Sequence, residues 1–206
     1  MFDMCYNKSI HEQLLTPATL ESIRTDTMIT ILECPYFVRD IYKEDLDALD
    51  EFDKKELQRR FIGCMIITKN MWDTVNLFEE AEMMTFISFS TYLDCSSESS
   101  SLHNLFQTTE STEDAVRIAR QSVEQGSRTL RRAMIKMDMV EEEFAALMGL
   151  MLWTVQSSSN DKLTEMADRN QQAILKELQA FYMRNAYQDE YAQRVGSLFS
   201  LILLIQ

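Results

Sequence analysis

The sequence predicts an all-α protein, and three features indicate this. Only 4 glycines and 2 prolines occur in 206 residues, although sheets joined by tight turns need more of both. Apolar residues recur at steps of three and four along most of the chain, which is the spacing of one face of a helix. Their share of 46% is that of a chain that folds around an apolar core. We therefore expect long helices joined by short polar loops.

The first fifty residues predict two short helical pieces. They are interrupted near Pro17 and Pro35, because a proline disfavours the helical conformation of the residue before it. We expect the second helix to stop at Pro35. One face of that helix would carry Leu20, Ile23, Thr27 and Ile31, with Met28 as a further candidate. The stretch from Tyr42 to Phe52 is acidic and polar enough to be either a loop or the solvated start of a helix.

A long amphipathic helix is expected from Asp53 onward. Its core-facing stripe, with members three and four positions apart, consists of Leu57, Phe61, Cys64, Met65, Thr68, Met71, Trp72, Val75 and Phe78. The apolar stretch that follows, from Met83 to Leu93, is rich in aromatic and small polar residues. Its periodicity leaves open whether it forms a buried helix or a strand.

The middle of the chain begins with a serine-rich loop at residues 96–101. A polar stretch follows, in which a short strand around Leu105 and Phe106 is one interpretation. Ser111 predicts the N-cap of the next helix, with Asp114 three positions on. The apolar face of that helix, at seven-residue spacing, consists of Val116, Val123, Leu130 and Met137.

The outer face of the same helix is basic. It carries Arg117, Arg120, Arg128, Arg131, Arg132 and Lys136. Two interpretations stay open: the face docks an acidic partner, or it is a solvated surface paired with nearby acids. Local pairing along a helix is the commoner use of such residues, so the second interpretation is favoured.

We expect Asp138 and Glu141 to form a capping pair at the start of the next helix. Glu141, Glu142 and Glu143 lie where the helix dipole favours negative charge, so this acidic triplet needs no catalytic explanation. From residue 144 to 155 the helix is apolar nearly all round. A helix of this kind belongs in the middle of a layered bundle.

Two more helices complete the chain. The first of these helices has an apolar face that we expect to point inward. This face consists of Leu163, Met166, Ala167, Ile174, Leu178 and Phe181. The last begins near Asp189, and from Leu198 to Ile205 it is almost wholly apolar. Such concentrated apolar surface usually marks a contact, either with the chain's own core or with a second chain.

Several function classes are excluded or disfavoured. The net charge of −13 argues against direct nucleic-acid binding, which needs clustered Lys and Arg. The 4 cysteines form no C-x-x-C pair, and with 2 histidines they make no recognisable zinc set, so no metal or cofactor is expected. Hydrolase, phosphate-loop, dinucleotide and zinc-protease motifs are absent, which predicts a protein that is not an enzyme. No secretory signal opens the chain, and no apolar run approaches the ~20 residues that span a bilayer.

The final third of the chain resembles a known family. The segments EEEFAALMGLMLW, KELQAFYMRN and YAQRVGSLFSLILLIQ, together with PYFVRDI near the start, are similar to the ligand-binding domain of nuclear hormone receptors. The likeness is greatest to the divergent receptors that are expanded in nematodes. In the last segment the matching positions are Tyr191, Ala192, Arg194, Gly196, Leu198 and Leu201.

This resemblance implies a three-layer helical sandwich of about 8–10 helices. Residues 1–206 would form one ligand-binding-type domain, with N-terminal helices and a loop over 1–50, a first half over 53–137 and a second half over 138–206. The second half would include a dimerisation-type helix. The resemblance further implies an apolar ligand pocket, for which an ordinary core is the alternative. Its lining would be Cys64, Thr68, Met71, Ile87, Ser88, Met148 and Met151.

Protein contacts are also implied by the resemblance. Lys69 is the candidate lysine of a coactivator groove. Pairing with a second receptor-type chain, as a homo- or heterodimer, would use Tyr191, Arg194, Leu198, Phe199 and Ile202.

The sequence departs from the family pattern in three places. The signature F-x-x-L with a downstream D-Q is not recovered after Phe78. Cysteines in the spacing of the DNA-binding zinc modules are missing, and the sequence ends inside the dimerisation-type helix, so the resemblance is to a domain truncated at both ends. We therefore expect a domain that binds a small lipophilic ligand and has no DNA binding of its own. It would regulate transcription through other nuclear receptors or coregulators, in the nucleus and also in the cytoplasm. The alternatives are a ligand-free helical adaptor and an incomplete gene product.

Overall fold

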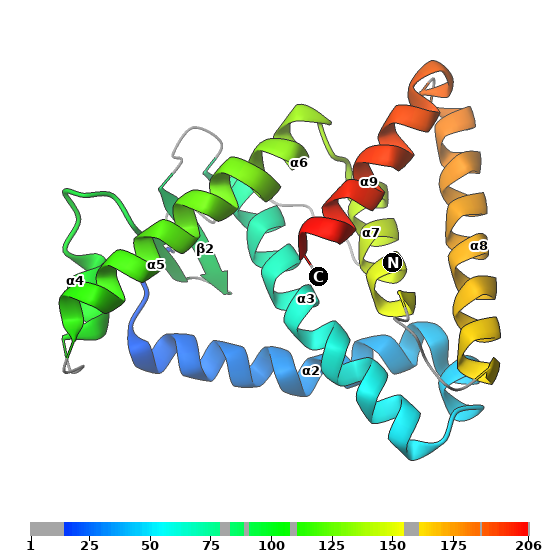
Figure 1. The fold of residues 1–206 in the computed structure, drawn as a ribbon, viewed down its shortest axis with the longest axis horizontal. Coiled ribbons are helices and arrows are strands. Elements are labelled where there is room, and N and C mark those ends of the chain that lie inside the picture. The colour runs from blue at the N-terminus through cyan, green and yellow to red at the C-terminus, as the bar shows by residue number, and fades with distance from the viewer. Residues whose placement is uncertain are drawn as a thin grey trace. The chain divides into compact units, whose positions relative to one another are not determined.

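The structure is a computed structural model that describes residues 15–78, 83–88, 91–107, 111–154, 161–185 and 187–205. Apart from a small sheet and the connecting loops, the described residues are helical (Figure 1), which confirms the predicted all-α class. They fall into two compact units: a first unit within residues 1–30 and 69–132, and a second within 31–68 and 133–206. The assignment of the whole chain to one domain stays a prediction.

Helix α2 (Leu20–Asp47) continues through Pro35, so the expectation that a helix stops there was wrong. An internal proline removes one backbone hydrogen bond and crowds the preceding turn. On α2 this cost is offset by burial, because Cys34 and Val38 next to it are 1% and 0% exposed. The helix geometry breaks instead at Tyr42, whose φ of −120° and ψ of 35° are not helical.

Helix α3 (Glu51–Leu77) confirms the long helix that was predicted from Asp53. It begins slightly earlier because Asp50 caps it: the Asp53 N–H donates to Asp50 Oδ1 at 2.8 Å. The acidic stretch that was left open between loop and helix start therefore contains the end of α2, a turn and the first turn of α3.

The apolar stretch after α3 forms strands, not a helix. Strands β1 (Thr16–Pro17), β2 (Met84–Ser88) and β3 (Thr91–Asp94) make a sheet in the order β1-β3-β2. β1 runs parallel to β3, and β2 runs antiparallel to it. Along β3 the buried side chains, Thr91 and Leu93, alternate with half-buried ones, which is the two-residue period of a strand.

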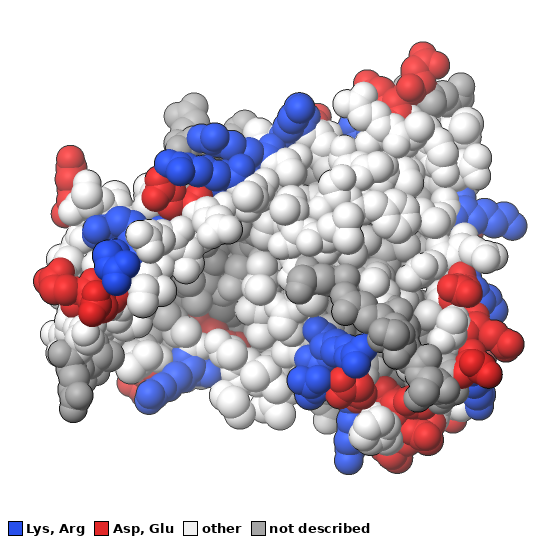
Figure 2. All heavy atoms as spheres, viewed as in Figure 1, with Lys and Arg blue, Asp and Glu red and all other residues white. Residues whose placement is uncertain are grey.

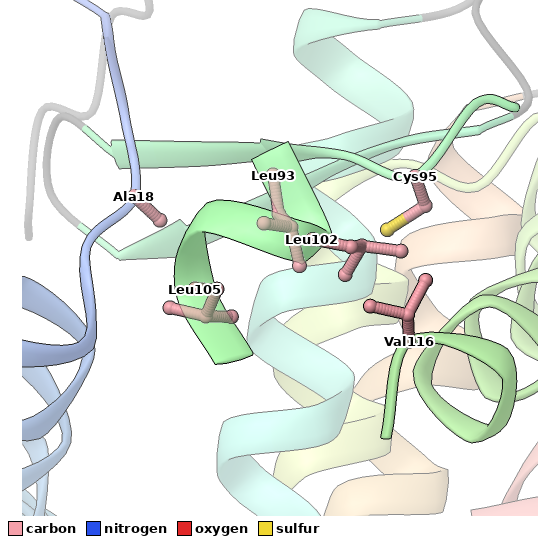
Figure 3. Close-up of a cluster of buried hydrophobic side chains, with 6 residues drawn as sticks. All are labelled: Ala18, Leu93, Cys95, Leu102, Leu105 and Val116. Atoms are coloured by element: carbon pink, nitrogen blue, oxygen red, sulfur yellow. The ribbon is translucent and has the colours of Figure 1, made fainter. Parts of the chain in front are cut away.

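Helix α4 (Ser101–Phe106) occupies the stretch for which a short strand around Leu105 was one interpretation, and that interpretation was wrong. Leu102 and Leu105 are 0% and 8% exposed. Residues three positions apart share one side of a helix, so both reach the same apolar cluster. Figure 3 shows this cluster, which consists of Ala18, Leu93, Cys95, Leu102, Leu105 and Val116.

The helix that was predicted after Ser111 is present as α5 (Thr112–Gly126), a π-helical turn (Ser127–Arg131) and α6 (Arg132–Lys136). Ser111 is its N-cap residue, as predicted. The serine hydroxyl does not accept a backbone N–H, however. It donates to Asp114 Oδ2 at 3.1 Å.

The basic face along α5 is paired with nearby acids. Arg117 Nη2 lies 3.0 Å from Asp114 Oδ1, and Arg128 forms an ion pair with Glu124 one turn before it. All four side chains are exposed, and Figure 2 shows blue and red atoms next to each other in this region. These pairs support the solvated interpretation of the face over an acidic docking site.

Arg131 does not belong to that outer face, so its assignment there was wrong. It is 2% exposed and donates a hydrogen bond to the carbonyl oxygen of Phe78. The π-helical turn that ends at Arg131 explains the change, because its wider i→i+5 hydrogen bonding shifts the register of the faces that follow.

The second unit contains α7 (Glu141–Trp153), α8 (Asp161–Arg184) and α9 (Tyr191–Ile205), with a 3₁₀ turn (Gln188–Glu190) before α9. α7 contacts both α8 and α9 (Figure 1). The central position that was predicted for it is confirmed within this unit, since most of its side chains are buried. Within the described ranges, no helix is both long and apolar enough to cross a membrane.

The cap that was predicted for α7 was wrong. The N-cap is Val140, and the Val140 N–H donates to Glu143 Oε2 at 3.1 Å. Asp138 lies before the cap with a φ of 47°, in the left-handed region. Glu143 therefore performs the capping that the sequence assigned to Asp138 and Glu141.

Candidate functional site

Four residues of the predicted ligand pocket lie in the second unit: Cys64 and Thr68 on α3, and Met148 and Met151 on α7. Thr68 is 0% exposed, and its hydroxyl donates to the Cys64 carbonyl oxygen at 2.7 Å. The same hydroxyl lies 3.5 Å from Met151 Sδ. The structure thus brings Thr68 and Met151 into direct contact.

Sulfur atoms give this region its chemical character. Met148 and Met151 are 8% and 4% exposed, and Cys64 is half-buried. Burial raises the pKa of the Cys64 thiol, which keeps it protonated and weakly polar. Flexible, polarizable side chains of this kind adapt to an apolar ligand, and they also pack an ordinary core.

The other three pocket residues belong to the first unit. Met71 Cε lies 3.4 Å from the position that a Cβ on Gly126 would take, so Met71 packs on α5. Ile87 packs against the cluster of Figure 3. Ser88 is the last residue of β2, and its side chain lies outside the described residues. The seven-residue pocket stays a prediction.

A buried polar network connects α7, α8 and α9. Glu143 Oε1 accepts hydrogen bonds from Tyr182 Oη and Arg194 Nε, both at 2.6 Å. Glu143 Oε2 accepts from Arg194 Nη2 at 2.8 Å, and that nitrogen also lies 3.2 Å from the carbonyl oxygen of Asp138. Glu143 and Tyr182 are 0% exposed and Arg194 is 7% exposed. This bidentate geometry is the strongest form of an Arg–carboxylate pair.

The network fixes the charge of each member. The hydrogen bond with Glu143 raises the pKa of Arg194, so the guanidinium stays charged. Burial, together with the hydrogen bond to Glu143, raises the pKa of Tyr182, which therefore stays a neutral donor. Arg194 also lies over the Tyr187 ring, 4.6 Å from its centroid. This arrangement holds α9 against α7 and α8.

Comparison with known proteins places the chain in a family. A model of the family described as the ligand-binding domain of nuclear hormone receptor matches residues 42–206. The chain belongs to this family. No curated protein and no solved structure matches it. The finer likeness to nematode-type receptors stays a prediction.

In this receptor domain, α9 is the helix for which dimerisation was predicted, and it has two faces. Arg194, Leu198 and Ile202 are 7%, 0% and 4% exposed, and they turn into the second unit. Tyr191 is half-buried, with its ring edge-on to Tyr182 at 5.8 Å between centroids. Only Phe199 of the predicted set, at 41%, is exposed.

The outward face of α9 has members that the sequence did not single out for pairing. Leu203 and Leu204, near Phe199, are 79% and 53% exposed. Figure 2 shows an uncharged surface over α9. We call Phe199, Leu203 and Leu204 the outer α9 face. Helical spacing from the buried Leu198 and Ile202 was the signal that could have separated the two faces.

Lys69, the candidate for a coactivator groove, is held within the receptor domain's first unit. Its Nζ lies 2.5 Å from Asp73 Oδ2 and 5.8 Å from the centroid of the Phe86 ring. The Asp73 side chain is 0% exposed, whereas that of Lys69 is 42% exposed. A partner helix that used this ammonium would have to share it with a buried carboxylate. The groove stays a prediction.

A cavity among the described residues of the second unit has a different character from a lipid pocket. It has a volume of about 790 Å³ and lies between the end of α2 and the start of α8. Its lining is largely charged, with Arg169 paired with Asp45 and Lys162 donating to the Ala48 carbonyl oxygen. Pockets for lipophilic ligands are mostly apolar, so this cavity does not match that expectation. Among the described residues, no group of His, Cys, Asp and Glu could hold a metal ion.

Proposed function

We propose that this receptor domain binds a small lipophilic ligand and regulates transcription through protein partners, without enzymatic activity. The observation that carries the proposal is the match of residues 42–206 to the ligand-binding domain of nuclear hormone receptors, a family that is generally non-enzymatic. The place of action would be the nucleus, with the cytoplasm as a second compartment. These 206 residues carry no C-x-x-C pair of the kind that zinc modules use, so the proposal assigns no DNA contact to them.

The ligand would lie against the sulfur-rich side of α7. Met148 and Met151 offer buried, polarizable surface there, and the Thr68 hydroxyl is a polar group next to it. A ligand with one hydroxyl or carbonyl on an apolar skeleton has the matching chemistry, because few polar groups in an apolar pocket fix the ligand's orientation.

The partner would be a second receptor-type domain that docks on the outer α9 face. Three exposed apolar side chains on a surface without charges support this choice, since exposed apolar patches mark protein contacts. Lys69 would add a coregulator contact, in competition with Asp73.

Native mass spectrometry of the purified chain tests both parts, because it measures bound small molecules and oligomeric state together. We expect a retained adduct of lipid size on the wild-type chain. The variant Met151→Lys, which adds a charge beside Thr68, is expected to lose the adduct. Met183→Lys is the matched control, since Met183 is 45% exposed on α8, and it should keep the adduct.

A ligand-free helical adaptor is the second candidate. The direct contact between Thr68 and Met151 favours it, because that contact is what a closed core would contain. Ligand binding to the folded state alone raises Tm in proportion to RT ln(1 + [L]/Kd). If the chain carries no adduct and no lipophilic compound raises its Tm, the adaptor function replaces the receptor function.

A further inference from the structure

Tyr42 lies where α2 loses its helical geometry, and its side chain packs on α7. Its ring meets the Trp153 ring edge-on, with 5.2 Å between centroids and 87° between planes. This is a favoured arrangement for two aromatic rings. The φ of −120° and ψ of 35° at Tyr42 interrupt the helix at that one residue. The break therefore gives this side chain a direction that a regular helix would not.

Gly149 leaves a notch for the phenol oxygen. A Cβ at position 149 would lie 3.0 Å from the Tyr42 hydroxyl and 2.8 Å from Ile174 Cδ1 on α8. Both distances are shorter than side chains tolerate without movement. The notch between α7 and α8 therefore exists only because residue 149 has no side chain.

Trp153 supplies a hydrogen-bond donor at the same place, which the Tyr42 hydroxyl satisfies only in part. The residue is 0% exposed, and its Nε1 has no acceptor at full hydrogen-bond geometry among the described residues. A buried donor without an acceptor costs free energy and calls for an explanation. The Tyr42 hydroxyl faces this donor. Burial raises the pKa of Tyr42, and the indole N–H of Trp153 acts against that change.

We propose that the seam between α7 and α8 is a binding site for a phenol group, and that Tyr42 occupies it as an internal ligand. The site has an aromatic wall in Trp153, a notch for an oxygen atom at Gly149 and an indole N–H that the Tyr42 hydroxyl faces without full hydrogen-bond geometry. The chemical class that it takes is a hydroxylated aromatic compound, with the hydroxyl oxygen toward Trp153 Nε1. The site lies on the side of α7 away from Met148 and Met151, so it is separate from the lipophilic pocket proposed above.

The test replaces the internal ligand by an external one. Tyr42→Ala empties the site, and p-cresol, which has the shape of a tyrosine side chain, is then added. We expect p-cresol at roughly ten times its Kd to raise the Tm of this variant by about 3–6 °C. Toluene, which lacks the hydroxyl, is expected to give a smaller shift. Wild type is the first control, because its site is filled. Tyr36→Ala is the second, since Tyr36 is 65% exposed on the same helix.

The Tm shifts of Y42A, Y36A and wild type distinguish the possible outcomes. A shift in Y42A alone supports the site, and a smaller shift with toluene supports the role of the Trp153 N–H. No shift in folded Y42A, or equal shifts in Y42A, Y36A and wild type, would overturn the proposal.

If Y42A does not fold, Tyr42→Phe keeps the ring and removes only the acceptor oxygen. The indole N–H signal of Trp153 in a ¹H–¹⁵N spectrum should then move, while that of Trp72 stays in place as an internal reference. A Trp153 signal that does not move contradicts the proposed contact.

Discussion

Glu143 carries a buried negative charge that groups from three separate places satisfy. It accepts hydrogen bonds from Tyr182 on α8, from Arg194 on α9 and from the Val140 N–H at its own helix start. Burying a carboxylate is costly unless it is paired and fully hydrogen-bonded, and here it is. Breaking the hydrogen bonds of Glu143 should therefore lower the free energy of unfolding much more than breaking an exposed ion pair does.

The substitution Glu143→Gln tests this expectation. It keeps the size of the side chain but leaves the buried Arg194 with only the exposed Glu190 carboxylate, 3.4 Å from its Nη1, as a counter-charge. We expect the free energy of unfolding in urea to fall by about 3–5 kcal/mol. Glu142→Gln, on the exposed side of the same turn, should change it by less than about 0.5 kcal/mol. Equal losses in the two variants would show that the network adds no stability.

Tyr182 gives the domain a stability loss at high pH. Its folded pKa is raised by burial and by the hydrogen bond to Glu143, whereas the unfolded phenol ionises near its ordinary value of 10.0. Above that pH the unfolded state holds fewer protons than the folded one, so stability is retained below pH 10 and falls above it. Above pH 10 the loss of folding free energy due to Tyr182 approaches about 1.4 kcal/mol per pH unit.

The measurement is urea unfolding between pH 9 and 11, roughly one unit on each side of the ordinary value. Over this range the free energy of unfolding of Tyr182→Phe should fall less steeply with pH than that of wild type. Tyr36→Phe keeps Tyr182 and should keep the wild-type slope. Parallel slopes for wild type and Y182F would contradict the assignment.

At the residue scale, the sequence predicted less of the site than the structure contains. Arg194 was found only through the family resemblance. Glu143 was explained by the helix dipole, because an acid in a first helical turn normally needs no partner. Tyr182 was missed, since its partner lies 39 positions away along the chain. Pairing at such separations leaves no mark in local periodicity, and a single sequence carries no other record of it.

The close contact of α7 with Tyr42 on α2 and Ile174 on α8 depends on Gly149. A Cβ at Gly149 would lie 2.8 Å from Ile174 Cδ1, whereas a Cβ at Gly196 in α9 would meet nothing within 4 Å. Overpacking should therefore cost Gly149→Ala about 1–3 kcal/mol of the free energy of unfolding, of which alanine's helix preference offsets about 0.5–1 kcal/mol. Gly196→Ala should raise it by about 0.5–1 kcal/mol, because alanine favours a helix and nothing obstructs it. Denaturant unfolding of both variants measures the difference, and a stabilised G149A would show that the helices can move apart freely.

Element prediction succeeded where one apolar stripe decides the structure. α3, α7, α8 and α9 each have a long stripe or an almost wholly apolar length, and all four were expected. It failed where a local signal competed with packing. Pro35 breaks helices on average, yet burial of Cys34 and Val38 carries α2 through it. Around Leu105 the segment was too short for periodicity to separate a strand from one and a half turns of helix.

On the scale of the whole molecule, α9 connects the buried network to the surface. Its inner side is fixed by Arg194 and by Leu198, which is 0% exposed, so the helix is held rigidly from within. Its outer side carries Phe199, Leu203 and Leu204. A rigid helix that presents apolar side chains on an uncharged surface is a good base for a symmetric contact, because little conformational freedom is lost on association.

The substitution Leu203→Asp tests that contact without touching the core, since Leu203 is 79% exposed. In a two-fold symmetric dimer the same residue occurs twice, so each substitution introduces two buried charges into one interface. We expect sedimentation equilibrium to show at least a tenfold increase in the dimer Kd, which corresponds to about 1.4 kcal/mol. Phe52→Asp, at a site on α3 that is 77% exposed, should leave the Kd unchanged. A wild-type chain that stays monomeric at roughly 50 µM, alone and mixed with related receptor domains, would contradict pairing through α9.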